Sequence, residues 1–225
     1  NYQNPIGAES TEAEMKWVAD LAIKHDLWVL SDEAYFEVRY SGRSKSIASL
    51  PDMAERTVIL YTFSKKFAMT GWRLGCAAGP TDVIEAISKF NTNQESCSNH
   101  FVQMAGLACL SGPAGPQNDI LDQLKLRRDA LVDALLAIDG VKVSKPETTF
   151  YLFPDVTDIF KRKGYTDSSK FRLDALYETG VSFCSREHFG RPLPGEDKVF
   201  IRFAYSGINV DQIQEGLAAL KGFWE

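Results

Sequence analysis

Apolar and polar residues follow two kinds of pattern along the chain, and the first has the period of a helix. Directly after Thr11, apolar residues recur every three to four positions, and Thr11 and Glu14 have the spacing of a capping box. This pattern predicts a helix that begins after Thr11. Its apolar positions are Met15, Val18, Ala19, Ala22 and Ile23.

The second pattern consists of short, nearly continuous apolar runs, at residues 26–35, 56–64 and 71–79. The first two runs end in polar residues, as strands do in a parallel sheet that is covered on both faces. The third run carries glycines, which indicate that a neighbouring backbone comes close. We therefore expect three strands of a layered β/α sheet in this part of the chain.

The pattern changes after the GPAGP segment at 112–116. Before it, helical patterns cover about 81–91 and 98–110, and after it a long amphipathic stretch covers about 117–138. Further on, the pattern predicts short strands at 141–143, 149–153, 181–184 and 199–205, with helices near 167–179 and 209–223. We expect two domains, an α/β unit over residues 1–118 and a smaller α+β unit over residues 119–225.

Composition narrows the class of protein. The 225 residues are 44% hydrophobic and 24% charged, which suits a globular protein with a real core. A net charge of −5 argues against a broad nucleic-acid surface, and no apolar run approaches the roughly 18 residues that span a bilayer. The polar start NYQNPIG lacks the features of a signal peptide. We expect a cytoplasmic protein with neither a nucleic-acid nor a membrane partner.

The cysteines and histidines show no metal-binding spacing. The four cysteines are far apart without a Cys-x-x-Cys pair, and the three histidines are scattered. We expect the cysteines to be buried, inert thiols in a reducing compartment, and we predict no metal site. The loop-like start, with no strand before it, also suggests that an upstream portion exists.

Chemically useful side chains gather where the predicted strands end. In open α/β sheets, ligands collect at the carboxyl ends of the strands. A carboxylate and a phenol follow the first strand, a hydroxyl and an amine follow the second, and a guanidinium comes just beyond. An amide lies in the loop before the first helix. These residues are Asn4, Asp32, Tyr35, Ser64, Lys65 and Arg73.

An aromatic aldehyde phosphate would use every member of this set. A lysine amine can bond to the aldehyde, and a carboxylate facing a pyridine nitrogen keeps that nitrogen protonated. A phenol and an amide can hydrogen-bond a ring hydroxyl, while arginine and serine can hold a phosphate. The set therefore predicts a cofactor of this chemical kind.

Four segments in order carry a resemblance to a known family. The chain resembles the pyridoxal-phosphate-dependent aminotransferases of fold type I, class I/II, of the aspartate aminotransferase type. NYQNPIG resembles the family's Asn-Pro-Thr-Gly loop with Ile6 in place of threonine, and Thr62 replaces the small residue usual at the head of the lysine signature. The matching segments are NYQNPIG (1–7), SDEAY (31–35), SKKFAMTGWRLG (64–75) and FIRFAYS (200–206).

The resemblance implies a role for each residue. Lys65 would form the Schiff base with pyridoxal 5'-phosphate, and Lys66 would be an ordinary neighbour. Asp32 would face the pyridine nitrogen, Tyr35 and Asn4 the ring hydroxyl, and Ser64 and Arg73 the phosphate. Arg202 would bind the α-carboxylate of the substrate. The implied reaction is transamination between an amino acid and a 2-oxo acid.

The resemblance also implies an architecture. Residues 1–118 would be the C-terminal part of a three-layer, mainly parallel-sheet large domain that binds the cofactor, and residues 119–225 the small C-terminal α+β domain. Family members are much longer and dimeric, so this chain would correspond to their C-terminal portion, and the whole protein would be a homodimer.

Other functions fit the same residues. The fold and lysine set also serve as ligand-sensing domains of transcription regulators, which bind without turnover. A β-eliminating lyase or a cyclopropane-forming synthase could use the same cofactor residues. A folded piece that binds no cofactor is the remaining alternative.

Overall fold

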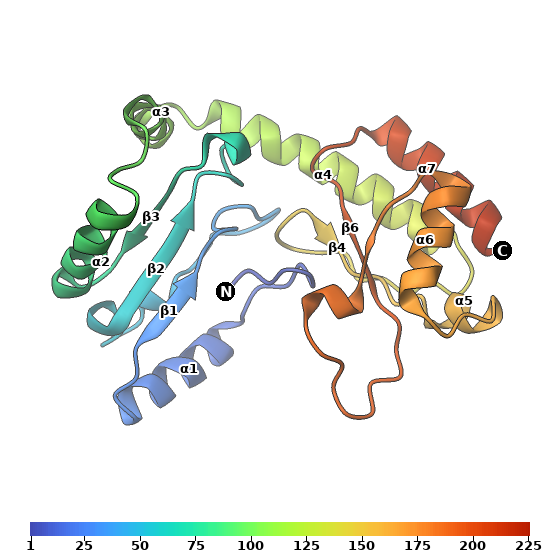
Figure 1. Ribbon diagram of the computed structural model, residues 1–225, viewed down its shortest axis with the longest axis horizontal. Coiled ribbons are helices and arrows are strands. Elements are labelled where there is room, and N and C mark those ends of the chain that lie inside the picture. The colour runs from blue at the N-terminus through green and yellow to red at the C-terminus, as the bar shows by residue number, and fades with distance from the viewer. The chain divides into compact units, whose positions relative to one another are not determined.

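A computed structural model describes residues 1–225. The chain folds into two compact units, which are described one at a time (Figure 1). Unit 1 comprises Asn1–Gln3 and Glu9–Leu121, and unit 2 comprises Asn4–Ala8 and Asp122–Glu225. The long helix α4 (Gly115–Leu136) contains the division, which falls close to the predicted boundary after residue 118. That boundary between domains stays a prediction.

Unit 1 is built on three strands. The helix predicted after Thr11 is α1, and both hydrogen bonds of its capping box are formed. The three apolar runs each form a strand, in the order β1-β2-β3. The elements of this unit are α1 (Glu12–Lys24), β1 (Val29–Asp32), β2 (Thr57–Thr62), β3 (Gly75–Ala78), α2 (Thr81–Gln94) and α3 (His100–Ser111). Short 3-10 helices lie at Ile47–Ser49, Ala54–Arg56 and Thr70–Trp72.

Strand direction in this sheet is mixed. β1 and β2 run parallel, with Ser31 opposite Ile59, whereas β3 runs antiparallel to β2, with Gly75 opposite Thr62. The antiparallel β3 returns the chain along β2 after the loop that carries Lys65. The sequence pattern identified the strand but not its direction, because side chains alternate with a period of two in either direction.

The expectation that both faces of the strands are covered was wrong for this chain. Leu30 of β1 is 67% exposed and Leu60 of β2 is 39% exposed. Helix α2 has no buried residue, and its Phe90 is 70% exposed. The apolar runs are continuous as in a doubly covered sheet, yet these side chains stay partly or largely exposed in this chain.

Unit 2 combines a three-stranded antiparallel sheet with helices. Its strands are short and lie in the order β4-β6-β5. Besides most of α4, its elements are β4 (Tyr151–Leu152), α5 (Thr157–Arg162), α6 (Ser168–Thr179), β5 (Cys184–Ser185), a 3-10 helix η4 (Arg186–Phe189), β6 (Ile201–Ala204) and α7 (Val210–Trp224).

Two predictions in unit 2 need correction. Residues 141–143 form no strand, because only Lys142 makes an isolated bridge, with Asp155. Helix α5 was not predicted, since its six residues are too few to show a helical period. The segment Asn4–Ala8 also packs with this unit rather than with the rest of residues 1–118. An added Cβ on Gly7 would lie 2.7 Å from the Pro146 Cβ atom, so the two backbones approach closely.

Aromatic rings fill the core of unit 2. The Trp224 ring of α7 stacks on Phe171 of α6, with centroids 5.8 Å apart, and Phe183 packs against both rings. Phe203 of β6 meets Phe183 edge to face at 5.6 Å. These rings are all buried, and the burial of each contributes about 1.5–3 kcal/mol.

The cysteines are not buried as expected. Cys76 and Cys97 are exposed, Cys109 and Cys184 are half-buried, and all four are free thiols. Cys76 lies opposite Tyr61 in the β2–β3 pairing, and partial burial raises the pKa of its thiol. None of the helices combines the length and the apolar character that crossing a bilayer requires.

Candidate active site

The predicted site residues divide between the two units. Unit 1 contains five of them, on the turn after β1 and on the loop between β2 and β3. Unit 2 contains the other two. The first set is Asp32, Tyr35, Ser64, Lys65 and Arg73, and the second is Asn4 and Arg202.

The turn after β1 presents a carboxylate beside a buried phenol. Asp32 is the last residue of β1 and is exposed, and its Oδ1 accepts a hydrogen bond from the Ala34 backbone N–H at 3.0 Å. Tyr35 follows in the same turn and is buried. The Lys65 Nζ lies 5.8 Å from the centroid of the Tyr35 ring. Segments 31–35 and 64–75 therefore meet in space, as the strand-end argument predicts.

Hydroxyl groups shape the start of the lysine loop. The Ser64 backbone N–H donates to the Thr62 Oγ1 at 3.2 Å, and the Thr62 hydroxyl donates to the Ser64 Oγ at 3.0 Å. The Thr70 hydroxyl donates to the Ser64 carbonyl at 3.1 Å. Ser64 is buried, and the Thr62 Oγ1 also lies 3.3 Å from the Leu74 carbonyl oxygen. Thr62, which departs from the family signature, thus supports the loop.

Apolar packing holds the underside of this loop. Phe63, Met69 and Leu74 form one buried cluster with Val102 of α3. A Cβ on Gly106 of α3 would lie 2.5 Å from the Leu74 Cδ2, so the helix approaches as closely as only glycine allows. The loop is therefore positioned by the core beneath it.

The two adjacent lysines have different surroundings. The Lys66 Nζ forms an ion pair with Glu37, and it also lies 5.1 Å from the centroid of the Phe67 ring. Lys65 instead lies over Tyr35, the residue that the sequence assigned to the same site. Burial, and then the negative charge of Glu37, raise the pKa of neighbouring Tyr61 to about 12. The two adjacent lysines therefore meet different neighbours.

Arg73 begins the return of the chain into β3. It caps the short helix Thr70–Trp72 with φ of 55°, in the left-handed region that non-glycine residues rarely adopt. Its Nη1 donates to the Thr70 carbonyl at 3.0 Å, and the side chain is exposed. Such backbone strain persists where the surrounding structure imposes it, often at ligand sites.

Arg202 in unit 2 has no acidic partner. It lies in β6 opposite Cys184 of β5. Its Nη1 donates to the Asn4 Oδ1 at 2.8 Å, and its Nη2 lies 3.6 Å from the Cys184 Sγ. Its Nε is buried and has no hydrogen-bond partner. A half-buried guanidinium without a counter-ion is a ready site for a carboxylate.

Two aromatic rings lie against the same guanidinium. The Arg202 Cζ is 4.3 Å from the centroid of Tyr151 and 4.7 Å from that of Phe189. Sequence analysis did not single out these rings or Cys184. Tyr151 could have been found from its predicted strand, whereas nothing local in the sequence marks Phe189.

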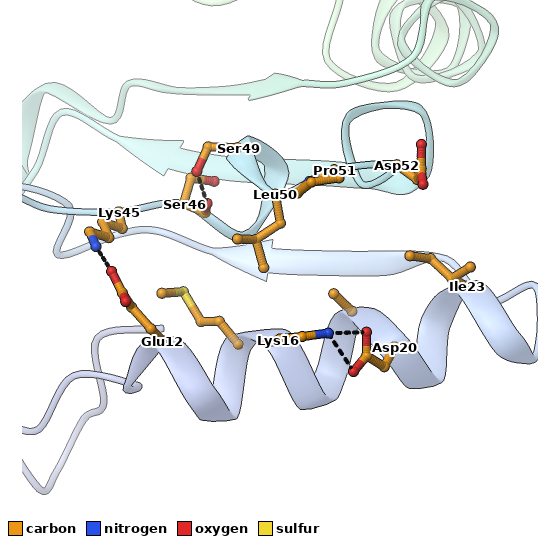
Figure 2. A pocket seen from close by; sticks show the side chains of 12 residues that line it. Glu12, Lys16, Asp20, Ile23, Lys45, Ser46, Ser49, Leu50, Pro51 and Asp52 are labelled. Carbon is orange, nitrogen blue, oxygen red and sulfur yellow. Dashed lines mark hydrogen bonds and ion pairs between the residues drawn. The ribbon is translucent and has the colours of Figure 1, made fainter.

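A groove in unit 1 contains none of the predicted residues. It has a volume of about 680 Å³ and lies between α1 and residues 45–52 (Figure 2). Its lining includes the apolar residues Met15, Ala19 and Leu50, and four of its charged residues form two ion pairs. Lys16 meets Asp20 at 2.8 Å, and Lys45 pairs with Glu12.

Comparison with known proteins decides the family. The family model described as aminotransferase class I and II matches residues 1–220. The chain belongs to the class I and II aminotransferases. An aspartate aminotransferase of Musicola paradisiaca is 36% identical over 92% of this chain, which covers 50% of that protein.

Solved structures of this family share the fold. The aromatic aminotransferase of Pyrococcus horikoshii has a TM-score of 0.84 and 31% identity, over 98% of this chain and 57% of its own. The aspartate aminotransferase of Rhizobium meliloti has a TM-score of 0.88 and 28% identity, over 98% and 55%. The predicted aminotransferase fold is confirmed. The chain spans about half the length of the curated relatives it matches.

Proposed function

We propose that the whole protein catalyses transamination between an amino acid and a 2-oxo acid with pyridoxal 5'-phosphate. The observation that carries this proposal is the Lys65 amine, held against Tyr35 on the loop after β2, while Glu37 neutralises Lys66. Membership of the aminotransferase family, whose enzymes use this cofactor, supports it.

The residues present suit the cofactor chemically. Asp32 keeps an exposed carboxylate at the end of β1, and Ser64 brings a hydroxyl to the start of the lysine loop. Lys65 would hold the aldehyde carbon, Asp32 the pyridine nitrogen, and Tyr35 with Asn4 the ring hydroxyl, while Ser64 and Arg73 would hold the phosphate. When bound, the cofactor supplies an electron sink for the charge that develops on the substrate α-carbon.

The protein's own groups would bind the substrate and move its protons. The Arg202 guanidinium would bind the α-carboxylate and so orient the α-carbon–hydrogen bond. Once the substrate amine has displaced Lys65 from the aldehyde carbon, the freed Lys65 amine would act as general base and acid, taking the α-proton and then giving a proton back. The Tyr35 hydroxyl and the Asn4 amide would tune the basicity of the bound group by hydrogen bonding. No metal is needed for these steps.

The test is a substrate profile of the complete protein. With pyridoxal 5'-phosphate added, we expect a visible absorbance band that changes with an amino acid, and a new amino acid formed from a 2-oxo acid. Ammonia and pyruvate as the products would instead identify a β-lyase. Binding of cofactor and amino acid without turnover would favour a sensing domain, and no absorbance band at all would contradict the proposal.

The assembly and location of the whole protein are further parts of this proposal. We expect a homodimer, and exposed apolar residues on α2 and α3, such as Phe90 and Phe101, are consistent with further packing. Sedimentation of the complete protein tests this, and a monomeric active enzyme would contradict it. Cell fractionation tests the expected cytoplasmic location.

A further inference from the structure

The loop that joins β5 to β6 brings Phe189 to Arg202. It begins with η4 (Arg186–Phe189), and the Arg186 backbone N–H donates to the Phe200 carbonyl at 3.0 Å, so the base of the loop continues the strand pairing. Phe189 ends this short helix and also contacts Phe153 edge to face at 6.1 Å. The placement of one of the two rings on Arg202 therefore depends on the loop.

One arginine organises the interior of this loop. The Arg186 Nε donates to the Glu196 Oε1 at 2.8 Å, and its Nη2 donates to the Glu196 Oε2 at 3.0 Å. The same guanidinium donates to the carbonyls of Gly190 at 3.0 Å and Arg191 at 3.3 Å. Glu196 also accepts from the Leu193 backbone N–H at 2.8 Å. We name the Arg186–Glu196 ion pair the latch.

The latch is stronger than an ordinary surface ion pair. Its two side chains are only 20% and 17% exposed, and the contact is bidentate. Partly buried, bidentate pairs between arginine and carboxylate hold a defined geometry, whereas exposed pairs contribute little. Because Arg186 reaches both Glu196 and the Gly190 carbonyl, it joins the two sides of the loop directly beside Phe189.

Gly190 adds a backbone requirement at the same point. Its φ of 125° lies in the region that L-residues rarely adopt, and no heavy atom lies within 4 Å of the position of a Cβ. A side chain here would meet no obstacle in space, so a substitution would act through the backbone conformation alone. That conformation sets the direction in which the chain leaves Phe189.

We propose that the latch and Gly190 are positioning residues that hold Phe189 against Arg202 and thereby set the affinity for the substrate's α-carboxylate. This inference rests on the proposed function. An arginine already held by aromatic rings loses less side-chain freedom when a carboxylate binds, and stacking leaves its N–H edge available. Loosening the loop should weaken substrate binding more than it slows the chemical step.

The experiment measures KM and kcat of the complete protein, loaded with cofactor, for L-aspartate with 2-oxoglutarate. Phe189→Ala should raise the KM for L-aspartate by about tenfold with kcat within about threefold, the scale of a partly desolvated cation–π contact. Phe189→Tyr should restore the KM, because it keeps the ring. Arg186→Gln should raise the KM in the same way, and Arg186→Lys should restore part of the loss.

Gly190→Ala has a matched control in the same unit. Gly180 ends α6 with φ of 72°, and a Cβ there would also meet open space. Both substitutions should lower stability, Gly190→Ala by more because its φ of 125° and ψ of 175° are accessible almost only to glycine, but only Gly190→Ala should raise the KM. An equal KM change in both variants would show a general loss of folding and would overturn the proposal.

The remaining outcomes separate the two proposals. If the wild-type protein transaminates and Arg202→Lys raises the KM, while the Phe189 and Arg186 variants leave it unchanged, the positioning role is wrong and the proposed function stands. If the wild-type protein transaminates no pair of substrates, or Arg202→Lys has no effect on the KM, the proposed function or its carboxylate site fails.

Discussion

The two units differ in how completely they bury their own apolar residues. In unit 2, Trp224, Ile201 and Leu220 are completely buried among neighbouring helices and strands. In unit 1, α2 buries no residue and Leu30 of β1 is largely exposed. Unit 2 carries Arg202, the proposed carboxylate-binding residue, on a closed core, whereas unit 1 carries Lys65 on a sheet with one face open.

This difference shows which parts of the candidate site support themselves. Arg202 is held by rings and by an amide from within unit 2. The Lys65 loop is supported from below by Phe63 and Leu74, whereas Arg73 and Asp32 are exposed. Four substitutions or conditions test this contrast, beginning with the largest expected effect.

Replacing Lys65 should have the largest effect. Lys65→Ala should lower kcat/KM of the complete protein by at least about a thousandfold, because the proposed function gives the amine two roles, as nucleophile and as general base. Lys66→Ala is the matched control, since it removes an adjacent lysine and the ion pair with Glu37. Lys66→Ala should lower kcat/KM by less than about tenfold. Loss of the cofactor absorbance band with Lys66→Ala alone would reverse the assignment.

Removing a core ring of unit 2 should cost much more than removing a ring from α2. Trp224→Ala should lower the free energy of unfolding by about 3–5 kcal/mol, because it empties a fully packed site. Phe90→Ala should change it by less than about 0.5 kcal/mol if the ring is as exposed as in this chain. Chemical denaturation measures both. A large cost for Phe90→Ala in the complete protein would show that α2 is covered there.

A methyl group at Gly75 should disturb the pairing of β3 with β2. The added Cβ would lie 2.9 Å from the Tyr61 carbonyl oxygen, a backbone atom that cannot move alone. Gly75→Ala should therefore cost about 1–3 kcal/mol of stability. Gly71→Ala is the control, because no atom lies within 4 Å of its Cβ position. Equal melting temperatures for the two variants would contradict the close approach.

Acid should weaken unit 2 through Asp155. Burial by itself would raise the pKa of Asp155, but hydrogen bonds from the Thr157 hydroxyl and backbone N–H, at 2.5 and 3.0 Å, lower it below its usual value. A lowered pKa in the folded state stabilises the protein above the ordinary Asp pKa of about 4, and this contribution is lost as the pH falls through the folded value.

Asp155→Asn tests this pH dependence. At pH 6 the variant should have a lower free energy of unfolding than the wild type. As the pH falls from about 5 to 3, the free energy of unfolding of the variant should decrease less than that of the wild type. Asp158→Asn is the control, since Asp158 forms a more exposed pair with Lys142. Unfolding curves at about pH 6, 5 and 3 measure the difference. The same pH dependence of the free energy of unfolding in wild type and Asp155→Asn would contradict it.

Much of the fold could be predicted from local patterns. The capping box at Thr11 and Glu14 located the start of α1, and each apolar run in unit 1 contained its strand. The strands of unit 2 were predicted longer than they are, and the strand predicted at 141–143 does not form. Strands of two to four residues leave little period to detect in the sequence.

The site was predicted from where strands end. Since parallel strands end at one edge, the residues after β1 and β2 had to meet, and the Lys65 amine does lie over Tyr35. The roles of these residues toward the cofactor stay predictions. The sequence could distinguish Lys65 from Lys66 only by resemblance to the family. The ion pair of Lys66 with Glu37 joins residues far apart in the chain, so no local pattern predicts it.

The chain's order of apolar runs, caps and chemical groups already specifies its elements, its family and the residues at its strand ends, because these depend on neighbours within a few positions. The rings that meet Arg202, the latch in the loop before β6 and the antiparallel course of β3 depend on residues that folding alone brings together. Packing and long-range ion pairs are properties of the folded chain, so only the tertiary structure could decide them.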